Sequence, residues 1–325
     1  MIIENSKTYD VNEVENLFFR PSFCGKSAEE LGIRVLYNMP IPTNVPIFFH
    51  HNNILKEFSS GWQGGTSATM QQKEIAMSKL KAEAAYSADS YFSTIYELLT
   101  NSPEVNLGDL SGTDLEKAET ELFRRAIAES IYSTMWFGDA DGDLSDFTGF
   151  TGFLRKIIDI REIDNPESDI VIDIDCPEVR VDNILYDVWQ RASSDLRALS
   201  ADGNLVYFVS SDIYDAYRFY LDKNGDLSSV MGGRPELFYH GIPIVEIPAN
   251  QYELRRAESF CVLTDRRNFV LALNTADSPE KGVHMWYNPD EMENRQRVVF
   301  LAGVTIADDN LVSATIYDEG VSIEM

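Results

Sequence analysis

The sequence predicts an α+β fold built from more than one structural unit. Three observations indicate this: a long amphipathic helical pattern over residues 113–137, an extended stretch with prolines and glycines over 31–70, and alternating strands and helices over 150–260. A chain of 325 residues is long enough for two domains, or for one core with extended excursions. A hydrophobic content of 44% and an aromatic content of 11% exclude a disordered chain.

Composition excludes several classes of protein. The formal net charge of −26 disfavours direct coating of nucleic acid, because the chain repels phosphates. No run approaches the ~18 apolar residues of a membrane-spanning helix. The polar, acidic N-terminus does not resemble a secretory signal or a transit peptide. Cys24, Cys176 and Cys261 are widely spaced and include no CxxC pair, which argues against a zinc site or disulfide framework and favours a reducing compartment.

The first 70 residues predict two extended parts. Residues 1–30 contain a short helical pattern from Val11 to Phe19 but too few apolar residues for a core, so they are interpreted as an arm. Residues 31–70 have strand composition interrupted by Pro40, Pro42 and Pro46 and then by Gly61, Gly64 and Gly65, which predicts a long hairpin. A long apolar hairpin aggregates unless something covers it. Either it lies on another molecule or it folds back on its own domain.

The middle of the chain predicts a strand followed by the longest helix. Residues 71–86 have strand composition, and Ser87 is a candidate cap for a short helix. In the long helix, Thr113 and Glu116 form a capping box and Gly138 supplies a stop. About 24 residues at ~1.5 Å each give a rod of ~36 Å. Its predicted apolar stripe contains Leu115, Ala118, Leu122, Phe123, Ala126, Ile127 and Ile131.

The second half predicts the α/β unit and closing strands. Residues 181–200 predict a helix capped by Asp182, with Ile184, Leu185, Val188, Trp189, Ala192 and Leu196 on one face. A buried strand over 205–209 and a third helix after Ser210-Ser211-Asp212 follow. The remaining predicted strands lie at 237–248 (interrupted by Gly241 and Pro243), at 266–275, and two or three times within 284–317.

Two acidic clusters are candidate calcium sites. They contain Asp139, Asp141, Asp143 and Asp146, and Asp222, Asn224 and Asp226. Neither fits the twelve-residue calcium loop, because the glycine falls at position four and Phe150 and Gly233 stand where glutamate is required. Ordinary turn chemistry is the alternative explanation for both clusters.

The sequence offers no catalytic constellation. His50, His51, His240 and His284 lie in strand-like or loop contexts. The sequence contains no HExxH, no GxSxG, no GxGxxG after a strand and no Walker loop. We therefore predict no catalytic, cofactor-binding or metal-binding residues.

The order of the parts is more specific than any one motif. The chain runs from arm to hairpin, then through KLKAEAAYSADSYF at 79–92 to the long helix that ends in Gly138-Asp139. A glycine-bearing segment at 149–152 and Gly241-Ile242-Pro243 follow. In this order the chain resembles the major capsid proteins of tailed bacteriophages, with the Hong Kong 97 fold, across essentially its whole length.

The resemblance implies a Hong Kong 97-like capsid fold. Its parts would be an N-terminal arm (1–30), an extended β-hairpin loop (31–70), a peripheral domain (71–150 and 262–325) with a spine helix (113–137), and an α/β axial domain (151–261). The spine helix would face a sheet built from residues 71–86 and 295–317. The extended loop would carry the inter-subunit contacts, with candidates Val45, Ile47, Phe48, Phe49, Leu55, Phe58 and Trp62.

The resemblance also implies a function. The protein would be non-enzymatic and would self-assemble through pentamers and hexamers into an icosahedral head, in the host cytoplasm. That head would enclose double-stranded DNA without sequence-specific contact, and no membrane would be involved. Its partners would be copies of itself and separate scaffold, portal and decoration proteins, because the N-terminal region is too short for the scaffolding extension of some relatives.

Two other functions stay open at this point. Within the same fold, the alternative is the shell of an encapsulin-type nanocompartment, which the fold alone cannot separate from a capsid. From a different class, the alternative is a two-domain α/β hydrolase or a calcium-dependent binding protein.

Overall fold

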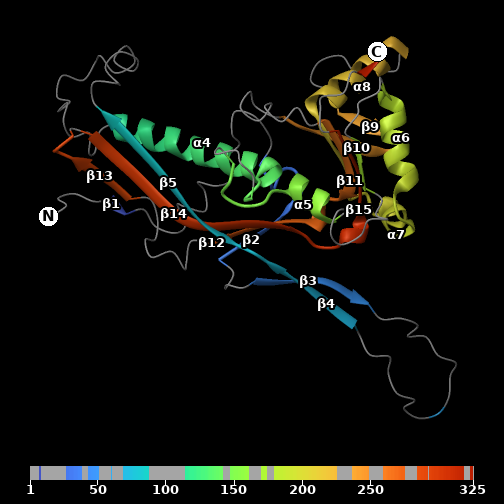
Figure 1. Ribbon diagram of the computed structural model, residues 1–325, viewed down its shortest axis with the longest axis horizontal. Coiled ribbons are helices and arrows are strands. Elements are labelled where there is room, and N and C mark those ends of the chain that lie inside the picture. The colour runs from blue at the N-terminus through green and yellow to red at the C-terminus, as the bar shows by residue number, and fades with distance from the viewer. Residues whose placement is uncertain are drawn as a thin grey trace.

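The computed structural model shows an elongated body from which one β-hairpin projects (Figure 1). It describes residues 7–8, 27–38, 43–50, 60, 69–87, 114–141, 147–160, 170–173, 179–224, 236–248, 259–274, 284–291, 293–317 and 323–324. Predictions that fall elsewhere, such as the helix at Val11–Phe19 and the helix after Ser87, lie outside these residues.

The first sheet is organised around its longest strand, β14 (Glu293–Ile306). Strand β5 (Ser78–Ser87) pairs with one side of β14, and β13 (His284–Asn288) and β12 (Phe269–Asn274) pair with the other. Strands β1 (Lys7–Thr8) and β2 (Arg34–Tyr37) complete the sheet beyond β13 and β12. Alternate residues of β14 point to opposite faces, so Val298, Phe300 and Ala302 enter the same core.

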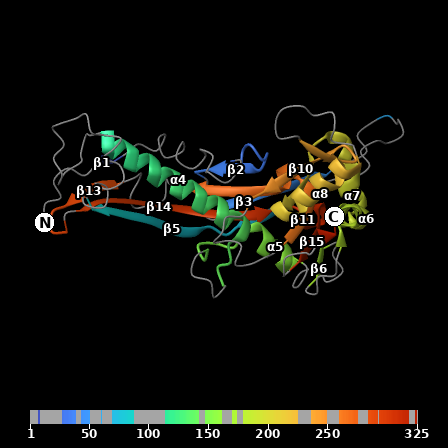
Figure 2. The same ribbon diagram turned by 90° about the horizontal axis from the view of Figure 1, so that it is seen from above.

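Helix α4 (Asp114–Phe137) lies along this sheet, which confirms the predicted long helix (Figures 1 and 2). Its described buried side chains include Phe123, Ile127, Ile131 and Met135. The predicted stripe is wrong at Ala126, which is exposed. Ala126 precedes Met135 by nine residues, and at ~100° per residue the two point to opposite sides of the helix. A small side chain such as alanine carries little information about which side is buried.

The second sheet has the strand order β6 (Ile170–Asp173), β15 (Val312–Tyr317), β11 (Ser259–Asp265), β8 (Leu205–Ser210), β10 (Ile242–Ile247) and β9 (Leu237–Tyr239). One face packs against α6 (Val181–Arg191) and α8 (Ser211–Asn224), and the other faces the first core. Strand β15 was expected beside α4 in the first sheet. That expectation is wrong, because a short turn after β14 carries the chain from one sheet into the other.

Several local predictions in this unit are refined. The helix predicted over 181–200 divides into α6, α7 (Ser194–Ala198) and the 3-10 helix η2 (Leu199–Asp202). The break occurs at Ser193, whose hydroxyl accepts a hydrogen bond from the Leu196 amide and caps α7. Asp182 lies in the first turn of α6, and the strand at 205–209 and the third helix are confirmed as β8 and α8.

The strand predicted over 237–248 is a hairpin of β9 and β10. His240 and Gly241 connect the two strands, and both have positive φ, of 50° and 81°. Two consecutive residues with positive φ form the tight turn that matches the twist of antiparallel strands. The interruption predicted at Gly241 is therefore a reversal of the chain.

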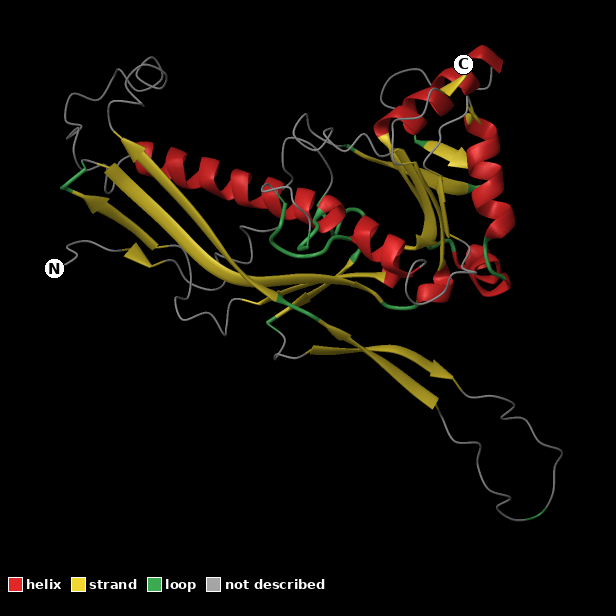
Figure 3. Cartoon of the chain, in the orientation of Figure 1, coloured by secondary structure: helices red, strands yellow, loops and turns green. Residues whose placement is uncertain are grey.

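Two small sheets complete the described fold. Strands β3 (Thr43–His50) and β4 (Thr69–Ile75) form the projecting antiparallel hairpin (Figure 3). Its register shifts between Pro46 and Phe48, as expected where proline cannot donate to a ladder. The hairpin predicted over 31–70 has the wrong bounds, because β2 pairs with β12 in the first sheet and β4 continues to Ile75. Strand β7 (Val179–Arg180) pairs with β16 (Ile323–Glu324). Over the described part of the chain, no helix has both the length and the apolar character of a membrane span.

Candidate assembly elements: the hairpin and the joint that carries it

Three connections pass between the two sheets at one place, which we call the joint. They are residues 138–141 and 147–160 with helix α5 (Phe153–Asp159), the 3-10 helix η4 (Arg266–Asn268) between β11 and β12, and the 3-10 helix η5 (Asp309–Leu311) between β14 and β15. Helix α5 contributes to the same core as α4. The joint therefore connects the end of the long helix to both sheets.

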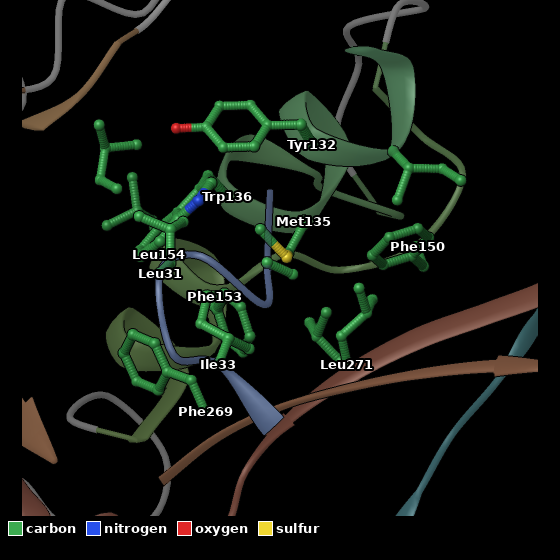
Figure 4. Packing of buried hydrophobic residues seen from close by; sticks show 14 of the residues in the cluster. Leu31, Ile33, Tyr132, Met135, Trp136, Phe150, Phe153, Leu154, Phe269 and Leu271 are labelled. Atoms are coloured by element: carbon green, nitrogen blue, oxygen red, sulfur yellow. The ribbon is translucent and has the colours of Figure 1, made fainter. Parts of the chain in front are cut away.

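The centre of the joint is an aromatic cluster around Trp136 (Figure 4). The Trp136 side chain is fully buried, and its ring centroid lies 5.4 Å from that of Phe153, 5.2 Å from Phe208 and 5.9 Å from Phe269. Phe153 and Phe269 stack on one another at 4.4 Å. These rings come from α4, α5, β8 and β12, so their packing fixes the helix end against both sheets. Buried aromatic pairs of this geometry add ~0.5–1.5 kcal/mol each beyond burial.

Two glycines let the chain turn back against the end of α4. The helix ends at Phe137, as the sequence predicts, but Gly138 is required for a different reason from the one expected. A Cβ on Gly138 would lie 2.2 Å from the carbonyl oxygen of Phe150, and one on Gly152 would lie 2.7 Å from the Thr134 oxygen. The Gly152 amide donates to the Gly138 carbonyl at 2.8 Å. Close backbone approach, and not a left-handed cap, explains both glycines.

Asn268 fastens η4 to the β14–β15 connection. Its side-chain amide donates to the carbonyl of Asp308 at 2.9 Å, and its side-chain oxygen accepts from the Asp308 amide at 2.7 Å. Its own carbonyl accepts from the Ala307 amide at 2.8 Å. Asn268 is buried, so these bonds form in a low-dielectric setting where an unsatisfied amide would cost ~1–3 kcal/mol.

The base of the hairpin is anchored beside the joint. Ile75, the last residue of β4, is buried against Val270 and Ala272 on the face of the first sheet opposite α4. Beyond it, the carbonyl of Ala76 passes so close to Gly303 that a Cβ there would lie 2.3 Å from the oxygen. The hairpin and β5 thus cross β14 at a point that only glycine permits.

An ion pair also connects the hairpin to the joint. The Lys73 ammonium lies 2.6 and 2.9 Å from the two carboxylate oxygens of Asp309 in η5. Lys156 on α5 is close enough for its charge to interact with both residues. Burial lowers the pKa of Lys156 and Lys73 lowers it further, while Asp159 and Asp309 oppose this shift.

The predicted contact residues divide into two groups. Val45, Ile47, Phe48 and Phe49 belong to β3 of the projecting hairpin. Leu55, Phe58 and Trp62 lie outside the described residues. The anchoring residues Lys73, Ile75 and Gly303 are not among the predicted contact residues. The sequence carries a signal for Ile75, which is the first apolar residue after the polar run at 71–74, but its partners are distant in sequence.

The other candidate residues do not converge. His50 ends β3, His240 lies in the β9–β10 turn and His284 lies in β13. Among the described residues, no three histidine, cysteine or acidic side chains are grouped to hold a metal ion. Asp222 and Asn224 lie in the last turn of α8 and not in a loop, and Asp143, Asp146 and Asp226 lie outside the described part.

Comparison of the sequence with protein-family models and with curated proteins finds no match. Solved structures do match, over nearly the whole chain. One, from the satellite phage P4 procapsid including the size determination (Sid) protein, has a TM-score of 0.56 at 10% identity and covers 90% of this chain and 94% of its own.

Two further structures agree. One, from the capsid of a native GTA particle, has a TM-score of 0.51 at 15% identity, covering 93% of this chain and 94% of its own. Another, from Gordonia phage Cozz, has a TM-score of 0.51 at 11% identity, covering 94% and 89%. At these identities the likeness shows the fold and not the individual function. The chain therefore has the Hong Kong 97-like capsid fold, a mixed α+β architecture.

Proposed function

We propose that this chain is the major capsid protein of a tailed bacteriophage, which assembles through pentamers and hexamers into an icosahedral head around double-stranded DNA. In this proposal the first sheet with α4 is the peripheral domain and α4 is its spine. The second sheet with α6 and α8 is the axial domain. Capsid proteins of this fold are structural and not enzymatic.

The observation that carries the proposal is the projecting hairpin on a rigid base. Strands β3 and β4 leave the body as a two-stranded ribbon (Figure 1). An isolated two-stranded hairpin is at best marginally stable in water, so a partner surface would stabilise it. A neighbouring copy is the partner that a shell supplies, and contacts of this head-to-tail kind close into rings. Many such modest contacts add up to a stable shell.

The charge of the chain fits enclosure of DNA without direct binding. With a formal net charge of −26, a lumenal surface of this protein would repel phosphates, and packaged DNA would not adhere to the wall during filling. Particles isolated from the native source should contain DNA. Particles that enclose a cargo enzyme in its place would favour the encapsulin-type alternative.

Replacing residues 45–65 with a Gly/Ser linker of equal length tests the role of the hairpin. The body should keep its circular dichroism and its cooperative unfolding, because both cores lie outside this segment. Assembly, followed by sedimentation and electron microscopy, should be lost. A linker variant that assembles normally would contradict the proposal, and one that fails to fold would show that the segment belongs to the core.

A further inference from the structure

The geometry points to Lys73 and Asp309 as the positioning pair that sets the direction in which the hairpin leaves the body. This inference rests on the proposed function only in giving that direction a purpose, namely reaching a neighbouring copy. Lys73 is in β4 and Asp309 is in η5, 236 residues apart in sequence. Their ion pair links the hairpin directly to the turn between the two sheets.

The pair lies on the outer side of a pivot. The hairpin crosses β14 where Ala76 passes Gly303, and Ile75 is buried immediately beside this crossing. These two contacts fix a point but not an angle, because apolar packing is non-directional. Lys73 lies three residues farther out than Ala76, ~10 Å along the strand, and on the same face as Ile75. A charged contact at that distance from the pivot restrains rotation about it.

Because of the charges around this pair, removing Asp309 should affect the hairpin differently from removing Lys73. Asp309 contacts Lys73 and also interacts electrostatically with Lys156, whose charge interacts with that of Lys73 as well. Asp159 lies near Lys156 and pairs with Arg155 at 3.1 Å. Removing Asp309 leaves the ammonium groups of Lys73 and Lys156, which repel one another. Removing Lys73 leaves Asp309 with Lys156, so the hairpin loses a restraint without being pushed away.

The test is a distance measurement on unassembled subunits. Spin labels are placed at Thr69, the first residue of β4, and at Ala201, which is exposed in η2, with Cys24 and Cys176 replaced by serine and the buried Cys261 retained. From Ala76 to Thr69 is ~23 Å of strand, so each ~10° of rotation displaces the label by ~4 Å. The distance distribution therefore reports the hairpin angle directly.

We expect a narrow distribution in the parent protein. Asp309→Asn should shift and broaden it by several ångströms, and Lys73→Met should broaden it less. Lys73→Arg should restore the parent distribution. Salt near 1 M, where the Debye length is ~3 Å, should broaden the parent distribution and should reduce the shift in Asp309→Asn, because it screens the repulsion between Lys73 and Lys156. The matched control is Lys81→Met, which removes an ion pair with Glu83 within β5 and should have no effect.

Identical distributions for the parent, Asp309→Asn and Lys73→Met would overturn the inference, whether or not the protein forms shells. If the distributions shift as expected but the parent protein never assembles, the positioning pair stands and the proposed function fails. Because either substitution alone is informative, misfolding of one variant does not remove the test.

Discussion

Gly303→Ala tests whether the hairpin is held by close backbone contact with β14. The added Cβ would lie 2.3 Å from the Ala76 oxygen and 3.2 Å from the Ala76 carbonyl carbon and the Met77 Cα. All three neighbours are backbone atoms, so no flexible side chain can move aside. Real Cβ atoms essentially never approach another atom more closely than 3.0 Å. The backbones at Ala76 and residue 303 would therefore have to move apart by at least 0.7 Å.

Two opposing effects set the expected change in the free energy of unfolding of Gly303→Ala. Overpacking of a buried contact costs ~1–3 kcal/mol. Replacing glycine in a strand returns ~0.5–1 kcal/mol, because the unfolded chain loses conformational freedom. The free energy of unfolding should therefore fall by up to ~2.5 kcal/mol, and by ~1 kcal/mol near the middle of both ranges. Because the clash is at the pivot, the hairpin should also lose protection against amide exchange in β4, beyond what the fall in global stability explains.

The assay is denaturant unfolding at unchanged m-value, combined with hydrogen exchange of β4 and of α4. The matched control is Gly149→Ala, whose nearest neighbours would be side-chain atoms, the end of Leu80 at 3.0 Å and the Thr134 methyl at 3.8 Å. We expect the control to keep parent-like exchange in β4. If Gly303→Ala leaves both stability and β4 exchange unchanged, the idea that this crossing requires glycine is refuted.

Two further predictions concern the joint and its charges. Trp136→Ala should lower the free energy of unfolding by ~3–5 kcal/mol and should reduce hydrogen-exchange protection in both sheets together. The control, Tyr186→Ala at a half-exposed position, should change the free energy of unfolding by less than ~0.5 kcal/mol. A loss of protection confined to one sheet would contradict a shared joint. The pKa of Lys156 is lower in the folded protein than the 10.5 of an unperturbed lysine. Between these two pKa values the unfolded state therefore binds more protons than the folded state. The contribution of Lys156 to the free energy of unfolding rises as pH rises through that window. Lys156→Met should therefore raise the melting temperature at pH 7 and remove this part of the pH dependence. An unchanged melting temperature and pH profile would show that burial of the Lys156 ammonium does not destabilise the folded protein.

The elements that could be predicted are those with strong local signals. The long helix was placed within one residue of its observed start, because a capping box and a sustained helical period mark it. Prolines, glycines and apolar strands predict a hairpin in this part of the chain, but they do not show that β2 leaves it for the first sheet, since that pairing is with distant β12. The resemblance to capsid proteins rested on the order of such parts, and order along the chain is a property that the sequence displays directly.

The joint could not be predicted, because it depends on contacts between distant residues. Nothing near Asn268 indicates that its amide binds the backbone of Asp308, and nothing near Lys73 indicates a partner at Asp309. The change of sheet between β14 and β15 occurs within a short turn whose composition resembles that of an ordinary hairpin turn. Gly303 had no local reason to be glycine, since the constraint comes from Ala76 crossing it.

Electron microscopy of the purified full-length protein, together with its sedimentation coefficient, tests the central claim most directly. A shell protein of this fold should form uniform closed particles or ring-shaped capsomers that sediment far faster than a 36.8 kDa monomer. A homogeneous monomer that persists at high protein concentration, with neither rings nor shells, would contradict the claim.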